Sequence, residues 1–327
     1  MKAWRIHEVG EPKEALQLVD VPDPEAGPGR LVVRVAATPA NFPDVLLCRG
    51  QYQMKPELPF TPGVELAGTV VAVGEGVTRF AVGDRIIGNP EFPFGGFAEL
   101  AVVPEEDAYR APASLDDAEA SALSIGYQTS WFALHRRTQL RAGETLLVHA
   151  AAGGVGSAAV QLGKAAGATV IGVVGGAEKA DYCRALGADV VVDRHREDFV
   201  DVVKDVTAGR GADVVYDPVG GDSYSRSTKC IAFEGRILVI GFAGGTIPQP
   251  ALNHALIKNY SIIGLHWGLY RQYNRAAIEA CHEELCRLAD DGAIRPLISE
   301  RLSLDDVADG VARLGDGHTV GRLVFQP

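Results

Sequence analysis

The chain has 327 residues, of which 47% are hydrophobic and 22% charged, and a formal net charge of −11 at pH 7. This composition is that of an ordinary globular protein, long enough for two domains with separate cores. The negative charge argues against nucleic acid or an anionic membrane as the main partner. No apolar run is long enough to cross a bilayer, and the N-terminal residues lack the apolar core of a signal peptide, so we expect a cytoplasmic protein.

Residues 1–125 have the pattern of a β-rich domain. Short apolar or alternating runs are separated by clusters of Gly, Pro and Asp, which is typical of strands joined by turns. The predicted strands are Leu31–Ala37, Glu65–Val73, Arg85–Gly88 and Phe97–Val103.

Residues 126–291 change to an alternation of strands and helices. The predicted strands are Thr145–Ala150, Thr169–Val174, Val190–Asp193, Ala212–Asp217, Arg236–Phe242 and Ser261–Trp267. Six strands with intervening helices imply a doubly wound parallel sheet. A long helix, Ala276–Asp291, precedes a tail of two predicted strands, Leu297–Leu304 and Arg322–Phe325, and a short helix from Leu304 to Leu314. We expect this tail, residues 292–327, to complete the first domain.

The segment TLLVHAAAGGVG, residues 145–156, has the features of a dinucleotide-binding turn. A predicted strand leads into a turn of small residues and then into a helix whose N-terminus would receive a pyrophosphate at Gly153, Gly154 and Val155. Gly153 would let the backbone approach the phosphates, and Gly156 would let the helix pack closely on the strand. Ala151 stands where the fingerprint usually has its first glycine, so the match is partial. The alternative is a βαβ turn that binds nothing.

The end of the next strand indicates which dinucleotide would bind. Sites that prefer NADH place Asp or Glu about 20 residues after the glycines, where the side chain binds the ribose hydroxyls. Here the strand ends in Gly175-Gly176, which leaves room for a 2′-phosphate, and Lys179 and Arg194 follow. Two cations with no carboxylate at the strand tip favour NADPH. Glu178 argues the other way, because it could reach the ribose from the first turn of the helix.

The cysteine and histidine residues do not have the spacing of a metal site. The five cysteines are odd in number and scattered, without a Cys-x-x-Cys pair, and the eight histidines lack a His-x-x-x-His spacing. We therefore expect reduced thiols and a protein without metal.

Several blocks together resemble the quinone oxidoreductase branch of the medium-chain dehydrogenase/reductase superfamily, which includes zeta-crystallin. They are AATPANFPDVLLCRGQYQ, LPFTPGVELAGTVVAVGEGV, GDR and AAAGGVGSAAVQLGKAAGATVIG, and the similarity extends from end to end. The resemblance implies an α/β protein with a GroES-like β-rich catalytic domain, 1–125 completed by 292–327, and a Rossmann domain, 126–291. It also implies an active site in the cleft between the domains, NADPH as hydride donor, and commonly a homodimer.

The chain departs from the zinc alcohol dehydrogenases of the same superfamily. Their Gly-His-Glu element, which contributes a zinc ligand, corresponds here to Gly63-Val64-Glu65, and Asn41 replaces their early zinc-binding region. The cysteine-rich lobe that binds structural zinc is absent. Without a Lewis acid to polarise an alcohol, acceptors that are already electron-poor, such as quinones and enones, become the expected substrates.

In the first domain the resemblance places Asn41, Phe42 and Asp44 at the mouth of the nicotinamide pocket. Asn41 would offer an amide near the nicotinamide ribose and the substrate, and Asp44 would orient its neighbours. The alternative for Asp44 is a helix N-cap. Tyr52 should face the cleft and stack on or hydrogen-bond a ring substrate, with a buried core tyrosine as the alternative.

In the second domain Thr129 begins a helix and matches the family's nicotinamide-contacting threonine. The remaining predicted cofactor contacts follow the last three strands of the sheet, at the edge where such sheets bind ligands; they are Val219, Gly241, Phe242, Ala243, Leu265, His266 and Trp267. His266 invites a role as proton donor, although the family has no fixed histidine there. Cys48 lacks a base partner, so a packed thiol is favoured over a nucleophile.

The expected reaction is hydride transfer from C4 of NADPH to a quinone or a conjugated carbonyl, with the proton arriving from solvent or Tyr52. Catalysis would rest on positioning two planar π systems face to face and excluding water. The alternatives are an enoyl reductase, acting on a free enone or a thioester, and an NADPH-binding protein whose turnover is incidental.

Overall fold

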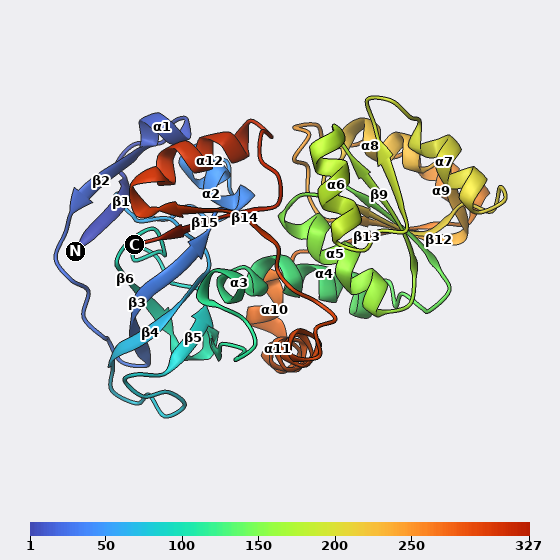
Figure 1. Cartoon of the computed structure of the whole chain (residues 1–327). Coiled ribbons are helices and arrows are strands. Elements are labelled where there is room, and N and C mark those ends of the chain that lie inside the picture. Colours follow the sequence, from blue (N-terminus) through green and yellow to red (C-terminus); the bar gives the residue numbers. More distant parts are fainter. The chain divides into compact units, whose positions relative to one another are not determined.

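The computed structural model describes all residues from Met1 to Pro327. The chain forms two compact units (Figure 1). Unit 1 contains Met1–Ile125 and Arg295–Pro327, and unit 2 contains Gly126–Ile294. None of the helices combines the length and the apolar character that a membrane span requires.

Unit 1 is built around a sheet of seven strands in the order β14-β15-β3-β4-β5-β7, with β6 paired to β3. The strands are β3 (Arg30–Pro39), β4 (Leu66–Val73), β5 (Arg85–Gly88), β6 (Leu100–Pro104), β7 (Ala108–Arg110), β14 (Ile298–Ser303) and β15 (Arg322–Gln326). A separate antiparallel pair joins β1 (Lys2–Ile6) and β2 (Leu16–Asp20). The helices of unit 1 are short: α1 (Pro12–Ala15), α2 (Phe42–Cys48), α3 (Asp117–Ser121) and α12 (Val307–Gly315). Two 3-10 turns, Glu105–Asp107 and Leu304–Asp306, complete it.

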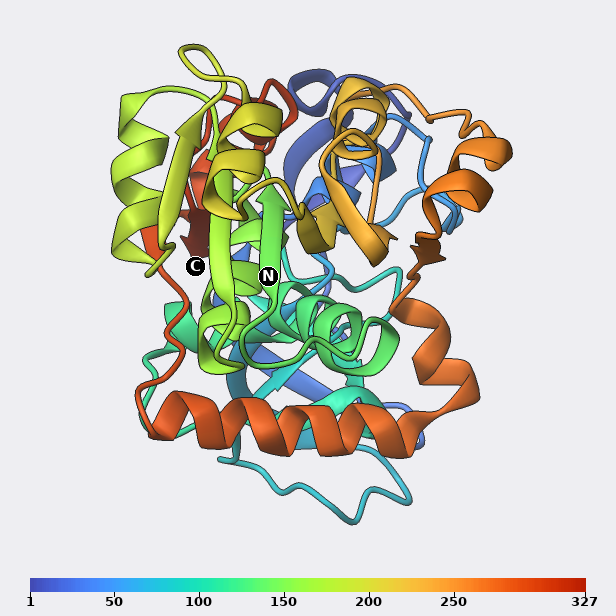
Figure 2. The same cartoon turned by 90° about the vertical axis from the view of Figure 1, so that its right-hand side faces the viewer.

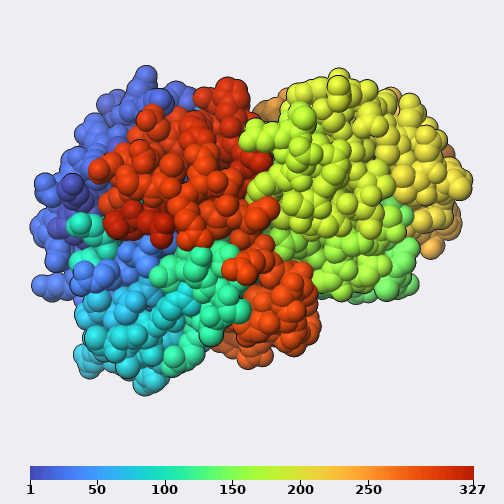
Figure 3. Space-filling model, viewed as in Figure 1, coloured from blue at the N-terminus to red at the C-terminus, as the bar shows by residue number.

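The C-terminal residues complete unit 1. Strand β15 pairs antiparallel with β3, with Val324 opposite Pro39, and parallel with β14. Helix α12 packs on α1 and α2, and Val307 and Val311 share a buried core with Trp4, Ile6 and residues of β15. Figure 3 shows the red C-terminal residues on the surface beside the blue N-terminal ones. A core shared by both chain ends cannot form until the tail has returned, so residues 295–327 are part of this fold rather than an appendage.

Unit 2 contains a six-stranded sheet in the order β10-β9-β8-β11-β12-β13, and all neighbouring strands are parallel. The strands are β8 (Thr145–His149), β9 (Thr169–Val174), β10 (Val190–Asp193), β11 (Ala212–Asp217), β12 (Ile231–Val239) and β13 (Ser261–Gly264). Numbered from β8, this is the 3-2-1-4-5-6 order of the dinucleotide-binding fold, in which the strand order reverses beside β8. The predicted doubly wound parallel sheet is therefore confirmed.

Helices connect and cover this sheet (Figure 1). They are α5 (Gly154–Ala165), α6 (Ala177–Ala185), α7 (Phe199–Val206), α8 (Gly221–Ser227) and α9 (Leu252–Lys258). After β13 come α10 (Gly268–Tyr273) and the long helix α11 (Arg275–Asp290), which Figure 2 shows joined end to end. Before β8, residues 123–137 form a helix of mixed geometry, with π-helical turns at Leu123–Tyr127 and Phe132–Arg137 on either side of α4 (Gln128–Trp131).

The predicted elements differ from the structure mainly at their ends. The expected strands 236–242 and 261–267 stop at Val239 and Gly264, because the residues after them turn into loops at the carboxyl edge of the sheet. The pair β1–β2 and strand β7 carry too little alternation to be recognised, and they exist because other strands pair with them.

Candidate functional site

The glycine-rich turn between β8 and α5 is closed tightly against the strand that precedes it. A Cβ atom on Gly156 would lie 2.2 Å from the carbonyl oxygen of Ala150, and one on Gly153 would lie 3.2 Å from the same atom. Ala150 itself has a left-handed backbone with φ 49°. Only glycine fits at 156, which brings the N-terminus of α5, at Gly153 to Val155, over the end of β8. The N–H of Gly153 donates to the carbonyl of Ala150 (2.8 Å), so the N–H groups that the turn presents where anions bind are those of Gly154 and Val155.

The tip of β9 lies beside a guanidinium group. A Cβ on Gly175 would be 3.0 Å from Nε and 3.3 Å from Nη2 of Arg194, so a longer side chain there would displace the arginine. Burial first, and then the charge of Arg194, lower the pKa of Lys179. The two cations are therefore close enough to repel one another, and an anion placed between them would relieve that repulsion.

Two carboxylates flank this pair of cations. Glu178 opposes the lowering of the Lys179 pKa, so it lies near the ammonium group. Asp193, at the end of β10, accepts hydrogen bonds from the backbone N–H groups of Gly176 (2.9 Å) and His195 (3.1 Å). The Asp193 carboxylate is thus bound to the loops that carry the cations, and it holds those loops in shape.

The loops after β11 and β12 are joined to each other. Buried Asp217 accepts from the backbone N–H groups of Val219 (2.9 Å) and Gly220 (3.0 Å), and the N–H of Ala243 donates to the carbonyl of Pro218 (3.0 Å). These bonds fix the backbone of Val219 relative to Gly241, Phe242 and Ala243. Four of the predicted contacts thus lie in one braced pair of loops.

The loop after β13 is tied to helix α4. The indole N–H of Trp267 donates to Oε1 of Gln128 at 3.2 Å, and both side chains are buried. Thr129 is the next residue along α4 and is half-buried, whereas His266 is exposed. The prediction that Thr129 begins a helix is wrong, because the helical turns start at Leu123. The hydroxyl of Ser130 donates to the carbonyl of Val155 at 2.9 Å and also meets the phenol oxygen of Tyr216, so α4 is anchored to the first turn of α5.

In unit 1 the predicted residues gather around helix α2. Asn41 precedes the helix, and all of its side-chain polar groups have partners. Its amide N–H groups donate to the carbonyl of Pro39 (3.2 Å) and to Glu65 (3.0 Å), and its Oδ1 accepts from Arg322 (3.1 Å). An amide held by three partners has a fixed orientation. The amide that was expected to be offered near the nicotinamide ribose is therefore already engaged within unit 1.

Asp44 has two roles in that arrangement. It is the third residue of α2 and not its N-cap, which is Asn41; the N-cap alternative for Asp44 is therefore wrong by three positions. One carboxylate oxygen accepts from the backbone N–H of Asn41 (2.9 Å) and the other from that of Gly63 (3.0 Å). Complete burial raises the pKa of Asp44 to about 7, against the effect of both hydrogen bonds. Asp44 thus joins α2 to the Gly63-Val64-Glu65 element.

The other residues of unit 1 that were singled out from the sequence also lie around helix α2. Tyr52 and Phe42 are half-buried and pack against the core that contains α2. Cys48 is fully buried, and burial raises the pKa of its thiol to about 12. The thiol form of Cys48 therefore persists at neutral pH, in agreement with a packed residue.

Two buried charged residues, Glu65 and Arg322, were not predicted from the sequence as site residues. Glu65 is fully buried and binds the guanidinium of Arg322 and the backbone N–H of Ile125, the latter at 2.6 Å. Arg322 opens the last strand and is also buried. Each of the two is a charged residue beside an apolar strand, and this was the only signal in the sequence. The sequence does not show that they pair, because they lie 257 positions apart.

The structure brings no three His, Cys, Asp or Glu side chains together in a way that could hold a metal ion. Val64 and Asn41, which stand where the zinc enzymes have ligands, are both in unit 1 near Glu65, and neither is a zinc ligand type. Zinc independence stays a prediction.

Comparisons with known proteins agree with this geometry. The model described as "Alcohol dehydrogenase GroES-like domain" matches residues 27–113, and the one described as "Zinc-binding dehydrogenase" matches residues 154–283. A quinone oxidoreductase-like protein 2 homolog of Nematostella vectensis is 38% identical over 301 residues, covering 91% of this chain and 82% of that protein.

Two solved structures are similar over the whole chain. A probable oxidoreductase from Mycobacterium abscessus is 38% identical, with a TM-score of 0.90 and coverage of 100% of this chain and 99% of that one. The Escherichia coli quinone oxidoreductase complexed with NADPH is 30% identical, with a TM-score of 0.92 and full coverage of both chains. With its GroES-like unit and Rossmann sheet, the protein is an oxidoreductase that belongs to the medium-chain dehydrogenase/reductase superfamily, among the quinone oxidoreductase-like proteins.

Proposed function

We propose that the protein is a zinc-independent, NADPH-dependent reductase that transfers hydride to a quinone or a conjugated carbonyl compound. The observation that carries the cofactor assignment is the juxtaposition of Gly175, Arg194 and Lys179 at the tips of β9 and β10. The relatives named quinone oxidoreductase support the acceptor class.

The residues present fit NADPH. Gly154 and Val155 would hold the pyrophosphate with backbone N–H groups at the helix N-terminus, and Gly153, whose own N–H donates to Ala150, would let the backbone approach the phosphates. Arg194 and Lys179 would bind the 2′-phosphate, since a dianion between two repelling cations lowers the energy of all three charges. Gly175 allows the Arg194 side chain to approach the tip of β9 closely, because a Cβ at that position would lie 3.0 Å from its Nε.

When bound, NADPH supplies a hydride from C4 of its nicotinamide ring. The braced loops at Val219 and at Gly241 to Ala243 would fix which ring face is presented, together with Leu265, His266, Trp267 and Thr129. In unit 1, Asn41, held by Glu65 and Arg322, would form the wall near the nicotinamide ribose, with Phe42 beside it and Asp44 holding the Gly63 turn. Tyr52 would act as a platform for the acceptor ring, and water would supply the proton.

Cofactor preference tests the assignment. We expect NADPH to bind at least tenfold more tightly than NADH, about 1.4 kcal/mol. Lys179→Ala and Arg194→Ala should each reduce this preference and leave NADH affinity nearly unchanged. Arg184→Ala, on the exposed side of α6 where the arginine pairs with Asp181, is the matched control and should change neither affinity. Equal titration curves for NADPH and NADH in the unmutated protein would contradict the proposal.

The acceptor class needs a separate experiment. NADPH oxidation should be measured against a panel of quinones, enals and enoyl thioesters. Saturation at low concentration by a quinone or an enone supports the proposal. Saturation by a thioester alone identifies an enoyl thioester reductase, and failure to saturate with any acceptor identifies a protein that binds NADPH with incidental turnover.

The partner we propose is a second copy of the chain. Strand β13 is the last strand of the sheet in unit 2, so its outer edge has unpaired backbone groups. The helix that precedes it, α9, exposes Leu252, Leu256 and Ile257. The same edge on a second copy is complementary to it through a two-fold axis, which is how most homodimers are built.

Sedimentation velocity tests the dimer. The double substitution Leu256→Lys with Ile257→Lys should convert a dimer to a monomer. Val206→Lys, which alters an exposed apolar residue on α7, is the control and should leave the dimer intact. If the unmutated protein sediments as a monomer at all concentrations, this interface is ruled out.

A further inference from the structure

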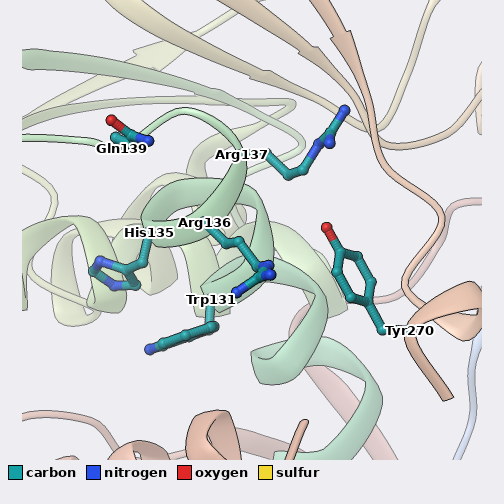
Figure 4. A pocket seen from close by; sticks show the side chains of 6 residues that line it. All are labelled: Trp131, His135, Arg136, Arg137, Gln139 and Tyr270. Atoms are coloured by element: carbon teal, nitrogen blue, oxygen red, sulfur yellow. The ribbon is translucent and has the colours of Figure 1, made fainter. Parts of the chain in front are cut away.

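Unit 2 has an open pocket of about 570 Å³ that none of the proposed cofactor contacts lines. Its lining residues are Trp131, His135, Arg136, Arg137, Gln139 and Tyr270 (Figure 4). Five of them come from the end of the helix of mixed geometry and the turn after it, and Tyr270 comes from α10. The volume is in the range of pockets that hold small molecules.

The backbone at this pocket is unusual. Residues Phe132–Arg137 are π-helical, and Gln139 has a left-handed backbone with φ 50° although it is not glycine. The hydroxyl of Thr138 holds the distortion by donating to the carbonyls of Ala133 and Leu134, both at 3.0 Å. Widened helical turns and left-handed side-chain-bearing residues occur preferentially at functional sites.

The pocket also carries positive charge. Arg136 and Arg137 are exposed and form no ion pair with a carboxylate, whereas Arg287 on the neighbouring helix α11 binds both Glu284 and Asp291. Glu284 is the carboxylate that acts on His135, and it is already held by Arg287 at 2.6 Å. Two guanidinium groups without carboxylate partners form a local patch of positive charge on a protein of net charge −11.

Aromatic rings lie beside Arg136. The guanidinium carbon of Arg136 lies 5.7 Å from the ring centroid of Tyr270, and that ring packs on Phe132 at 4.2 Å. Trp131 is half-buried and lies 5.6 Å from His135, centroid to centroid. In Figure 4, Arg136 lies between Trp131 and Tyr270, so its positive charge borders both rings, whereas the side chain of Arg137 points away from them.

We propose that this pocket binds a phosphate monoester carried on a planar ring, the chemistry of a nucleoside monophosphate. The guanidinium groups of Arg136 and Arg137 match the geometry of phosphate oxygens. Trp131 supplies a face on which a base stacks, and Tyr270, packed on Phe132, supports the guanidinium of Arg136. The amide of Gln139 can both donate to and accept from the edge of a base. The site goes beyond the proposed NADPH site, because the two share no residue.

Calorimetric titration of the full-length protein with adenosine 5′-monophosphate, in the presence of saturating NADP⁺, tests this inference. We expect one saturable site per chain. Arg136→Gln and Arg137→Gln should each weaken binding by about tenfold or more, as the loss of a charge-assisted hydrogen bond requires. Tyr270→Leu should weaken it by a similar factor. Arg184→Gln, an exposed arginine on α6, should leave the affinity unchanged.

Ribose 5-phosphate, which lacks the base, distinguishes a ring-phosphate site from a simple phosphate site, and we expect it to bind at least about tenfold more weakly. Absence of saturable binding, binding abolished by NADP⁺, equal affinities for the two ligands, or unchanged affinity in both arginine variants would each overturn the inference. NADPH titration of the same variants should be unaltered, so a failure here is separable from a failure of the proposed function.

Discussion

Arg322, in the last strand of the chain, forms a buried ion pair with Glu65, which lies 257 residues earlier. The side chain of Glu65 is fully buried and that of Arg322 is 7% exposed. Both also bind the side chain of Asn41, through its amide nitrogen and its oxygen respectively. The C-terminal strand therefore does more than complete a sheet, because it orients a side chain predicted to lie at the nicotinamide pocket.

For this reason we expect the removal of Arg322 to lower the free energy of unfolding strongly. Arg322→Met leaves the Glu65 carboxylate buried without its cation, and breaking a buried pair in this way lowers the free energy of unfolding by about 3–5 kcal/mol. Arg301→Met is the matched control, because Arg301 pairs with Asp116 at 2.6 Å while both side chains are nearly half exposed. The control should cost less than about 1 kcal/mol. Urea unfolding of both variants checks this, and equal losses would show that the buried pair has no special role.

Asp44 should make stability depend on pH. Burial raises its pKa from 3.8 to about 7 in the folded protein, so the folded state holds the proton more tightly than the unfolded state. The resulting stabilisation is fully present below about pH 4 and is lost as pH rises to about 7. Asp44→Asn cannot titrate, so the difference in unfolding free energy between the unmutated protein and this variant should change across that window. A pH-independent difference would contradict the raised pKa.

The sequence predicted unit 2 better than unit 1. Strands 169–174, 190–193 and 212–217 have the predicted bounds, because parallel strands between helices are buried on both faces and appear as uninterrupted apolar runs. Strands β1 and β2 alternate poorly and depend on each other for pairing. A strand fixed by its neighbours leaves little trace in its own residues.

The part of the candidate site that is formed by the backbone could be predicted from the sequence. Gly156 was recognisable because only glycine fits against the Ala150 carbonyl. The network of Asn41, Glu65 and Arg322 was not, since it depends on three buried side chains from distant segments. The pocket at Arg136 was also invisible, because nothing in the residues themselves shows the π-helical turn that forms its rim.

Chelation tests the predicted zinc independence. Dialysis of the protein against a strong chelator should change neither the melting temperature nor the rate of NADPH oxidation, because no metal-binding energy would be coupled to folding. The prediction rests on Val64 and on the lack of a closely spaced cysteine set. Stoichiometric zinc in the purified protein, lost together with activity, is the outcome that contradicts it.

Substitutions of Tyr52 show whether its side chain serves as a platform for the acceptor ring or as an obligatory general acid. If the half-buried phenol only packs and orients the acceptor, Tyr52→Phe should change turnover by less than about tenfold, and Tyr52→Ala should mainly raise KM. A required general acid would lower turnover by roughly 10²-fold in both variants. We expect the platform, because a reduced quinone is a stable anion that water can protonate. Steady-state kinetics of both variants with one quinone across pH decides between them, and a large pH-dependent loss in Tyr52→Phe contradicts the platform.

The central claim is stereospecific hydride transfer from NADPH to the acceptor, and isotopic labelling tests it directly. NADPH carrying deuterium on either face of C4 is oxidised with the quinone that saturates best, and the deuterium content of the NADP⁺ formed is measured by mass spectrometry. Because the loops after β11, β12 and β13 are braced, one ring face alone should be presented. We predict that one labelled form loses all of its deuterium and the other retains all of it. Partial loss from both forms, or no enzyme-dependent oxidation, would contradict the account.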